Sequence, residues 1–232
     1  MLKKLHKRVK DLERRLNVPN YSDLSNPEHR RRAYWHYQLM DHAFLRAWWT
    51  NFHPVTEGVY RSNQPGPARL RRYHEMGIRA VLNLRGAADT SYHLFERDAC
   101  RRYGMEMVDI GLSARSLPLP DTLLELERIF RTIPRPFVMH CKSGADRAGF
   151  ASALYLMMIE GAPVEVAARQ LHWRYLHLKK YDTGVLDHFL RTYARAQRRS
   201  GIGLMEWIRT GYDRDAVGRD FQLWRKGEWE AE

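Results

Sequence analysis

The chain has 232 residues, 44% of them hydrophobic, and a formal net charge of +12. This length suits one well-buried domain with appendages, and no apolar run approaches the roughly 18 residues of a membrane-spanning helix. Two cysteines cannot build a disulfide framework and favour a reducing compartment, so we expect a cytoplasmic protein. The positive charge predicts an acidic partner: a phosphorylated substrate, anionic lipid headgroups or nucleic acid.

Residues 1–18 predict a basic amphipathic helix. Apolar side chains recur there at spacings of three and four among lysines and arginines: Leu2, Leu5, Val9, Leu12 and Leu16. Such a helix could lie peripherally on an anionic membrane or pair with a second copy of itself. Because the helix is short, we expect it to dock on its own domain or to fray at the chain end.

Residues 28–50 show a second helical pattern that is rich in aromatic side chains, among them Tyr34, Trp35, Tyr37, Trp48 and Trp49. A membrane-interface belt would explain such a stripe, but packing against the rest of the protein is its more common fate. We therefore predict an N-terminal basic and aromatic-rich helical extension over residues 1–54.

Residues 55–198 alternate between strand-like and helical patterns. Strands are predicted over residues 58–62, 78–84, 105–112 and a run ending at His140, and helices over residues 68–76, 91–103, 121–132, 148–159, 164–175 and 184–195. This alternation predicts an α/β fold with a central, mostly parallel sheet flanked by helices. We expect residues 55–198 to be a catalytic domain and residues 199–232 to be a C-terminal helical tail packed on it.

The segment from Phe137 to Gly149 joins an apolar run, a cysteine, an arginine and a helix. A helix N-terminus and a nearby cation can lower the pKa of a thiol by several units, which would make Cys141 a thiolate. Arg147 offers two parallel donors that match phosphate oxygens. Backbone N–H groups of the loop would bind the same phosphate, at Lys142, Ser143, Gly144 and Ala145. These features predict phosphate monoester hydrolysis through a cysteinyl-phosphate, without a metal or other cofactor.

The motif His140-Cys141-x5-Arg147 resembles the signature of the protein tyrosine and dual-specificity phosphatase superfamily. Two upstream segments, residues 59–65 and 78–86, are similar to its atypical branch, which is found in bacteria, fungi and plants. The resemblance covers about residues 55–195. It implies the cysteine-phosphatase fold and a catalytic pair formed by Cys141 and Arg147.

The general acid departs from the family's pattern. Related enzymes supply an aspartate from the loop after the strand that precedes the catalytic strand. Here that loop, residues 113–118, contains no carboxylate. We predict Asp146 as the acid, because a similar aspartate precedes the arginine in myotubularin-type lipid phosphatases, and Asp109 as the alternative. Asp121 is expected to cap the helix that follows.

A second departure lies directly after the arginine, where the family commonly has Ser or Thr and this chain has Ala148. The resemblance gives that hydroxyl the task of easing the departure of the cysteine sulfur from the phospho-enzyme. We therefore expect slow hydrolysis of the intermediate.

The substrate is left open between phosphotyrosine on a protein and a phosphoinositide or inositol phosphate. Lys142 resembles the loop lysines with which lipid and inositol phosphatases hold extra phosphates, and Arg85 and Arg115 could extend the basic wall. The rival function is a pseudophosphatase that binds phosphate or anionic lipid without efficient turnover. Nucleic acid is not expected as a partner, because the chain carries no recognisable nucleic-acid-binding module.

Other kinds of site fit less well. Cys100 lies in a helical run without a cationic loop, and we expect it to be a core residue. A dithiol redox site would need a second cysteine two residues away. His172 and His177 have the wrong spacing to bind a metal from one helical face.

Overall fold

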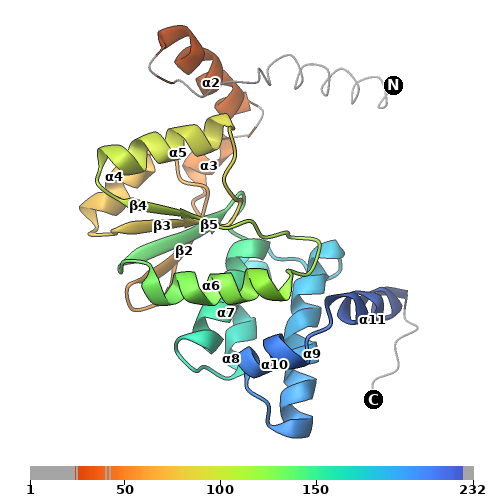
Figure 1. Ribbon diagram of the computed structural model, residues 1–232. Coiled ribbons are helices and arrows are strands. Elements are labelled where there is room, and N and C mark those ends of the chain that lie inside the picture. The colour runs from red at the N-terminus through yellow and green to blue at the C-terminus, as the bar shows by residue number, and fades with distance from the viewer. Residues whose placement is uncertain (1–23, 25, 40, 42, 227–232) are drawn as a thin grey trace, which may run out of the picture.

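The structure is a computed structural model that describes residues 24, 26–39, 41 and 43–226. The amphipathic helix predicted over residues 1–18 lies outside the described residues, as does the end of the predicted C-terminal tail. Figure 1 shows a sheet between two layers of helices. The predicted α/β fold is thereby confirmed.

The sheet has five strands in the order β1-β2-β5-β3-β4. Their bounds are β1 His53–Thr56, β2 Val59–Asn63, β3 Ala80–Asn83, β4 Glu106–Asp109 and β5 Phe137–Cys141. Among the pairs of strands in the described residues, only β1–β2 is antiparallel. In the parallel part, Asn63 lies in register with Cys141, and Asn83 with both His140 and Asp109. The carboxyl ends of four strands therefore meet at one edge, where sites in such sheets form.

Each central strand is buried on both faces, which explains its nearly continuous apolar sequence. Along β5, Phe137 and Met139 join one core, and Val138 joins a second core on the opposite face. In Figure 1 helices α4 and α5 cover one face of the sheet, and α6 and α7 cover the other. The strand that carries Cys141 thus lies in the most enclosed part of the domain.

The helices follow the predicted pattern closely in the first half of the domain. Their bounds are α4 Pro67–Glu75, α5 Ser91–Arg102, α6 Pro120–Thr132 and α7 Asp146–Met158. The predicted cap of α6 is wrong, because the helix begins at Pro120 and Leu119 takes the cap position without a side-chain bond. Asp121 lies instead in the first turn, where a carboxylate favours the positive helix end.

The single helix predicted over residues 164–175 is wrong. Its place is taken by α8 (Val164–Ala167) and two 3-10 turns, Ala168–Gln170 and Trp173–Tyr175. Arg61, on β2, binds the backbone carbonyl of Gln170 at 2.7 Å and lies over the Tyr175 ring. These tertiary contacts hold the segment in a shape that local helix propensity does not favour.

The helix predicted over residues 28–50 is interrupted, and the described part of this segment forms α2 (Pro27–Leu39) and α3 (Leu45–Trp48). Tyr37 of α2 packs on Phe95 of α5, with ring centroids 5.8 Å apart. The aromatic stripe is only partly covered, since Trp35 is 55% exposed and Trp48 is 94% exposed. None of the helices in the described part of the chain is long and apolar enough to cross a bilayer.

The C-terminal part adds α9 (Val185–Ser200), α10 (Leu204–Thr210) and α11 (Arg214–Lys226). Trp207 of α10 and Phe221 of α11 are buried in the same core as the α6–α7 face of the sheet. These helices therefore pack on the predicted catalytic domain. The exact domain boundaries stay a prediction.

Candidate active site

Cys141 ends β5 and is buried, with 1% of its surface exposed. Five residues later α7 begins at Asp146, so the four-residue loop 142–145 lies between the end of the strand and the positive end of a 13-residue helix. The predicted sequence of strand, loop and helix is confirmed. We call residues 141–147 the Cys141 loop.

Each backbone carbonyl oxygen of residues 142–145 accepts a hydrogen bond from a residue outside the Cys141 loop. The backbone N–H of Gln64 donates to Lys142 O at 3.4 Å, and the Asn51 side-chain amide donates to Ser143 O at 3.1 Å. Arg61 donates to the remaining two carbonyls. In a trans peptide the carbonyl and the next N–H point in opposite directions. Holding the carbonyls on the scaffold therefore turns the N–H groups toward the other side, where an anion would lie.

Arg61 is the main brace of this loop. Its Nη2 donates to Gly144 O at 2.7 Å and to Ala145 O at 3.0 Å, while Nη1 donates to Gln170 O and to the Gln170 side chain. The side chain is fully buried, and its guanidinium carbon lies 4.0 Å from the centroid of the Tyr175 ring. Burial lowers the pKa of Arg61 to about 10, so the side chain is still a cation at neutral pH.

Gly144 must be glycine for two reasons. Its φ of +74° lies in the left-handed region that side chains rarely adopt. A Cβ at this position would also lie 2.7 Å from the backbone nitrogen of Asn63 and 2.7 Å from the carbonyl carbon of Ser62. The loop is therefore packed directly against the end of β2.

Arg147 is half-buried at the start of α7. No hydrogen bond or ion pair joins its guanidinium to another residue within the described ranges. Its donors are therefore available to an anion held above the loop.

Asp146 contacts His177, a residue that the sequence did not connect with the Cys141 loop. His177 Nδ1 lies 2.8 Å from Asp146 Oδ1, and His177 Nε2 lies 2.6 Å from Asp187 Oδ2. Burial alone would lower the pKa of His177, but the hydrogen bonds that it donates to these two carboxylates outweigh burial and raise the pKa to about 9. At neutral pH a protonated His177 therefore links Asp146 to Asp187, with both ring nitrogens donating.

This arrangement predicts a pH-dependent contribution to stability. Because the folded pKa of His177 is raised, its contribution is complete below about pH 6.5 and is lost as the pH rises through about 9. The difference in free energy of unfolding between wild type and His177→Gln should therefore shrink from about pH 6 to about pH 9.5. Urea denaturation at both pH values measures it, with the exposed His74→Gln as control. A difference that is constant over this range would show that His177 is not charged in the folded protein.

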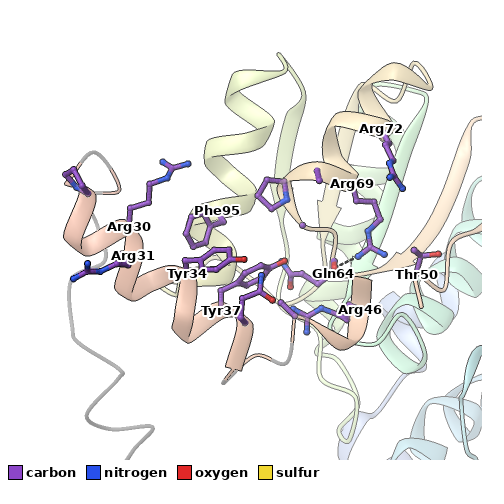
Figure 2. Close-up of a pocket in the computed structure, with 16 residues that line it drawn as sticks. Arg30, Arg31, Tyr34, Tyr37, Arg46, Thr50, Gln64, Arg69, Arg72 and Phe95 are labelled. Atoms are coloured by element: carbon purple, nitrogen blue, oxygen red, sulfur yellow. Dashed lines mark hydrogen bonds between the residues drawn. The ribbon is translucent and has the colours of Figure 1, made fainter. Parts of the chain in front are cut away.

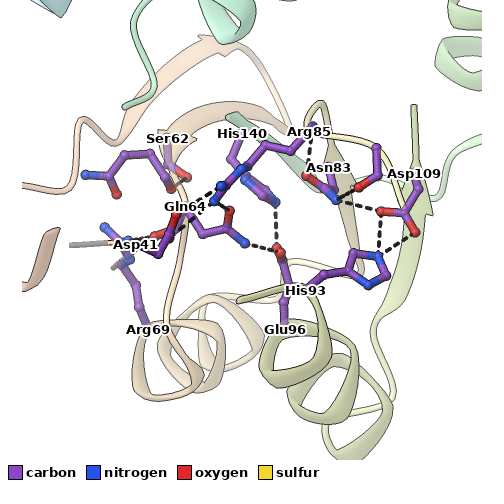
Figure 3. A network of polar contacts seen from close by, with 12 residues as sticks. Asp41, Ser62, Gln64, Arg69, Asn83, Arg85, His93, Glu96, Asp109 and His140 are labelled. Carbon is purple, nitrogen blue, oxygen red and sulfur yellow. Dashed lines mark hydrogen bonds and ion pairs between the residues drawn. The ribbon is translucent and has the colours of Figure 1, made fainter. Parts of the chain in front are cut away.

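Asp109, the alternative acid, is part of a separate cluster (Figure 3). It accepts from Asn83 Nδ2 at 2.7 Å, and His93 Nε2 lies 3.0 Å from Oδ2. Burial raises the pKa of Asp109, but the hydrogen bonds from His93 and Asn83 prevail and hold it below the usual value. A carboxyl group that is ionised so readily is poorly suited to donate a proton.

The predicted substrate residues lie in different surroundings. Arg85 is committed to the protein, because Nη2 lies 3.0 Å from Asp41 Oδ1 and Nη1 donates to Gln64 Oε1 at 2.5 Å (Figure 3). Lys142 remains nearly half exposed and lies 3.6 Å from the same Asp41 oxygen. Arg115 is exposed and lines a groove with residues of α11. A role for these three residues in substrate binding stays a prediction.

Asp41 was not anticipated from the sequence. It lies between α2 and α3 and is 4% exposed. Its carboxylate pairs with Arg46 and Arg85 and lies near Lys142 of the Cys141 loop. Burial raises the pKa of Asp41, but the Arg85 hydrogen bond and the surrounding cations prevail and lower it. The N-terminal extension therefore places a fixed negative charge beside the loop.

The other predicted residues behave as follows. Cys100 is 2% exposed and belongs to the core between the sheet and α4–α5, as predicted. Burial raises its pKa far above the usual range of a thiol, so it is unreactive. His140, directly before Cys141, is fully buried, and its Nε2 lies 2.5 Å from Glu96 Oε1.

Comparison with known proteins adds sequence evidence to this geometry. Residues 119–169, which contain the Cys141 loop, match the tyrosine phosphatase family. The predicted resemblance to the cysteine phosphatases is confirmed. An inositol diphosphatase of Arabidopsis thaliana, DSP4, is 25% identical over 104 residues, which are 43% of this chain and 51% of DSP4. The chain thus matches about half the length of this curated relative.

A solved phosphatase domain also shares the fold. The core catalytic domain of the PP-IP phosphatase SIW14 from S. cerevisiae superposes with a TM-score of 0.50 at 17% identity. The match covers 65% of this chain and 93% of the SIW14 domain. At this identity the likeness shows the cysteine-phosphatase fold and no more.

Proposed function

We propose that this protein is a cysteine-dependent phosphatase that hydrolyses phosphate monoesters through a cysteinyl-phosphate on Cys141. The observation that supports it most is the arrangement of the Cys141 loop. The carbonyls of residues 142–145 are all hydrogen-bonded to the surrounding protein. A loop held in this way presents N–H groups to an anion directly above a buried cysteine. Family membership of residues 119–169 supports the same reaction class.

The reaction would proceed in two displacements. The Cys141 thiolate attacks phosphorus in line, an S–P bond forms and the P–O bond to the leaving group breaks. The loop N–H groups and Arg147 bind the equatorial oxygens, on which negative charge is spread in the transition state. Water then attacks the cysteinyl-phosphate, and the sulfur leaves as a thiolate. Asp146 would pass a proton from His177, whose Nδ1 lies 2.8 Å from Oδ1, to the leaving oxygen in the first step and take one from water in the second.

We propose two substrate classes, phosphotyrosine on a protein and an inositol phosphate or phosphoinositide. DSP4 is named an inositol diphosphatase, and the nearly half-exposed Lys142 beside the loop could bind a second phosphate. The test is release of inorganic phosphate from phosphopeptides, inositol phosphates and phosphoinositides at matched concentrations. Hydrolysis of at least one class is expected. Binding without hydrolysis of any of them would support the pseudophosphatase alternative.

An Asp146→Asn variant tests the proposed acid with two substrates. General acid catalysis contributes about 10²- to 10⁴-fold. The variant should lose a factor of this size on a phosphotyrosine peptide and little on p-nitrophenyl phosphate, whose leaving group needs no proton. Asp109→Asn is the matched comparison. If Asp146→Asn slows both substrates equally, or neither, Asp146 is not the acid.

A further inference from the structure

A pocket of about 810 Å³ lies between α2 of the N-terminal extension and helices α4 and α5 (Figure 2). Its size is within the range of roughly 300–1,000 Å³ that is typical of small-molecule sites. None of the residues that line it belongs to the Cys141 loop. It is therefore a separate site from the one that carries the proposed reaction.

The wall of this pocket is basic and aromatic. Figure 2 shows Tyr34, Tyr37 and Phe95 grouped together, and Arg46 and Arg69 beside Gln64. Arg30, Arg31 and Arg72 also line it, and none of its lining residues in the described part of the chain is acidic. Such a wall suits an anionic group attached to an apolar body.

Two of the arginines have buried donors that the protein does not use. Arg69 Nη2 donates to the backbone oxygen of Gln64, but its Nη1 is buried and has no hydrogen-bond partner within the described residues. Arg46 is 7% exposed and binds Asp41, yet its Nε is also buried without a partner there. A buried charged donor is costly unless an acceptor is supplied. A bound phosphate would supply acceptor oxygens to both side chains.

Arg72 adds an available cation at the edge of the pocket. It is exposed, and no ion pair binds it within the described residues. Its neighbour Arg71 on the same helix does not line the pocket and pairs with Glu75 at 3.5 Å. The two arginines thus differ in position but not in chemistry, which makes them a matched pair for a test.

We propose that this pocket binds a phosphate ester carried on an apolar body. The phosphate would lie against Arg69 and Arg72, and the apolar body against Tyr34, Tyr37 and Phe95. A diacyl phosphate lipid and a soluble aryl phosphate share this chemistry. The site would be an additional binding site, distinct from the phosphate that Cys141 attacks.

The test measures binding in an Arg147→Met background, in which the Cys141 loop lacks its phosphate clamp. Isothermal titration with dioctanoyl phosphatidic acid and with phenyl phosphate should show one saturable site per chain for at least one of them. The ester that binds more tightly shows whether the natural ligand is a lipid or a soluble phosphate ester. Inorganic phosphate, which has no apolar body, should bind at least about tenfold more weakly. Adding Arg72→Met should weaken ester binding about tenfold, and Arg71→Met less than about twofold.

Three outcomes would overturn the proposal. These are no saturable binding of either ester, equal losses in the Arg71 and Arg72 variants, and binding that wild type shows but the Arg147→Met background lacks. Filling the pocket with Ala68→Phe in the same Arg147→Met background gives a second test, because Ala68 is exposed on the first turn of α4 and lines the pocket. That variant should abolish ester binding at this site while keeping a wild-type circular dichroism spectrum. Since the titration requires no turnover, its result is independent of whether the protein is a phosphatase.

Discussion

A Cys141→Ser variant is expected to lose hydrolysis of p-nitrophenyl phosphate by at least about 10⁴-fold. The buried thiol at the end of β5 is the group proposed to attack phosphorus, and a serine hydroxyl is a weak nucleophile unless a base ionises it. Because the two side chains are similar in size, the fold should be retained. Phosphate release at saturating substrate measures the effect.

Cys100→Ser is the matched control, since this second cysteine is also buried but lies in the other core. It should keep wild-type turnover per folded molecule, even if the polar hydroxyl in that core lowers stability. Residual turnover by Cys141→Ser within tenfold of wild type would mean that Cys141 is not the nucleophile.

Arg61→Met is expected to lower kcat about 100-fold and to destabilise the fold. The substitution leaves the Gly144 carbonyl without its donor, at a cost of roughly 1–3 kcal/mol for a buried group, and leaves the Ala145 carbonyl with the Gly149 N–H alone. The freed Gly144 carbonyl can rotate toward the bound phosphate, and a misplacement of about 1 Å in a catalytic loop can cost about 10²-fold. Turnover and urea denaturation measured on the same sample separate the two effects.

Arg61→Lys and the exposed Arg101→Met complete this experiment. The lysine variant keeps the charge but lacks the fork that reaches two loop carbonyls and Gln170 together, so it should resemble Arg61→Met in kcat. Arg101 is 84% exposed, and its loss should change neither quantity. Full activity in Arg61→Lys would show that charge alone, rather than the bracing geometry, is what the loop requires.

The parts of the fold that could be predicted are those with local signals. The apolar run over residues 78–84, the glycine stops and the sequence around Cys141 and Arg147 each carry a pattern within about ten residues. These patterns predicted the four parallel strands, the helices of the first half and the position of the Cys141 loop, but not the antiparallel strand β1. The break in the predicted helix over residues 164–175 carries no such signal, because contacts with Arg61 impose it.

Three residues of the site were not predicted because their contacts also lie far away in the sequence. Arg61 contacts residues more than 80 positions away, and His177 joins Asp146 across 31 positions. Asp41 reaches Arg85 across 44 positions. One local signal could have found Arg61, since a charged residue inside a strand that is otherwise buried needs a partner in the core. No local pattern connects Asp41 or His177 to the Cys141 loop.

Acid quenching during turnover detects whether phosphate is transferred to Cys141. Ala148 offers no hydroxyl to help the sulfur leave, so the cysteinyl-phosphate should accumulate and survive the quench. Mass spectrometry of wild type mixed with p-nitrophenyl phosphate should then show one added phosphate on the peptide that contains Cys141, and none in Cys141→Ser. Steady turnover without a phosphorylated Cys141 peptide at any quench time, or with the phosphate on another residue, would show that Cys141 is not the group that receives phosphate.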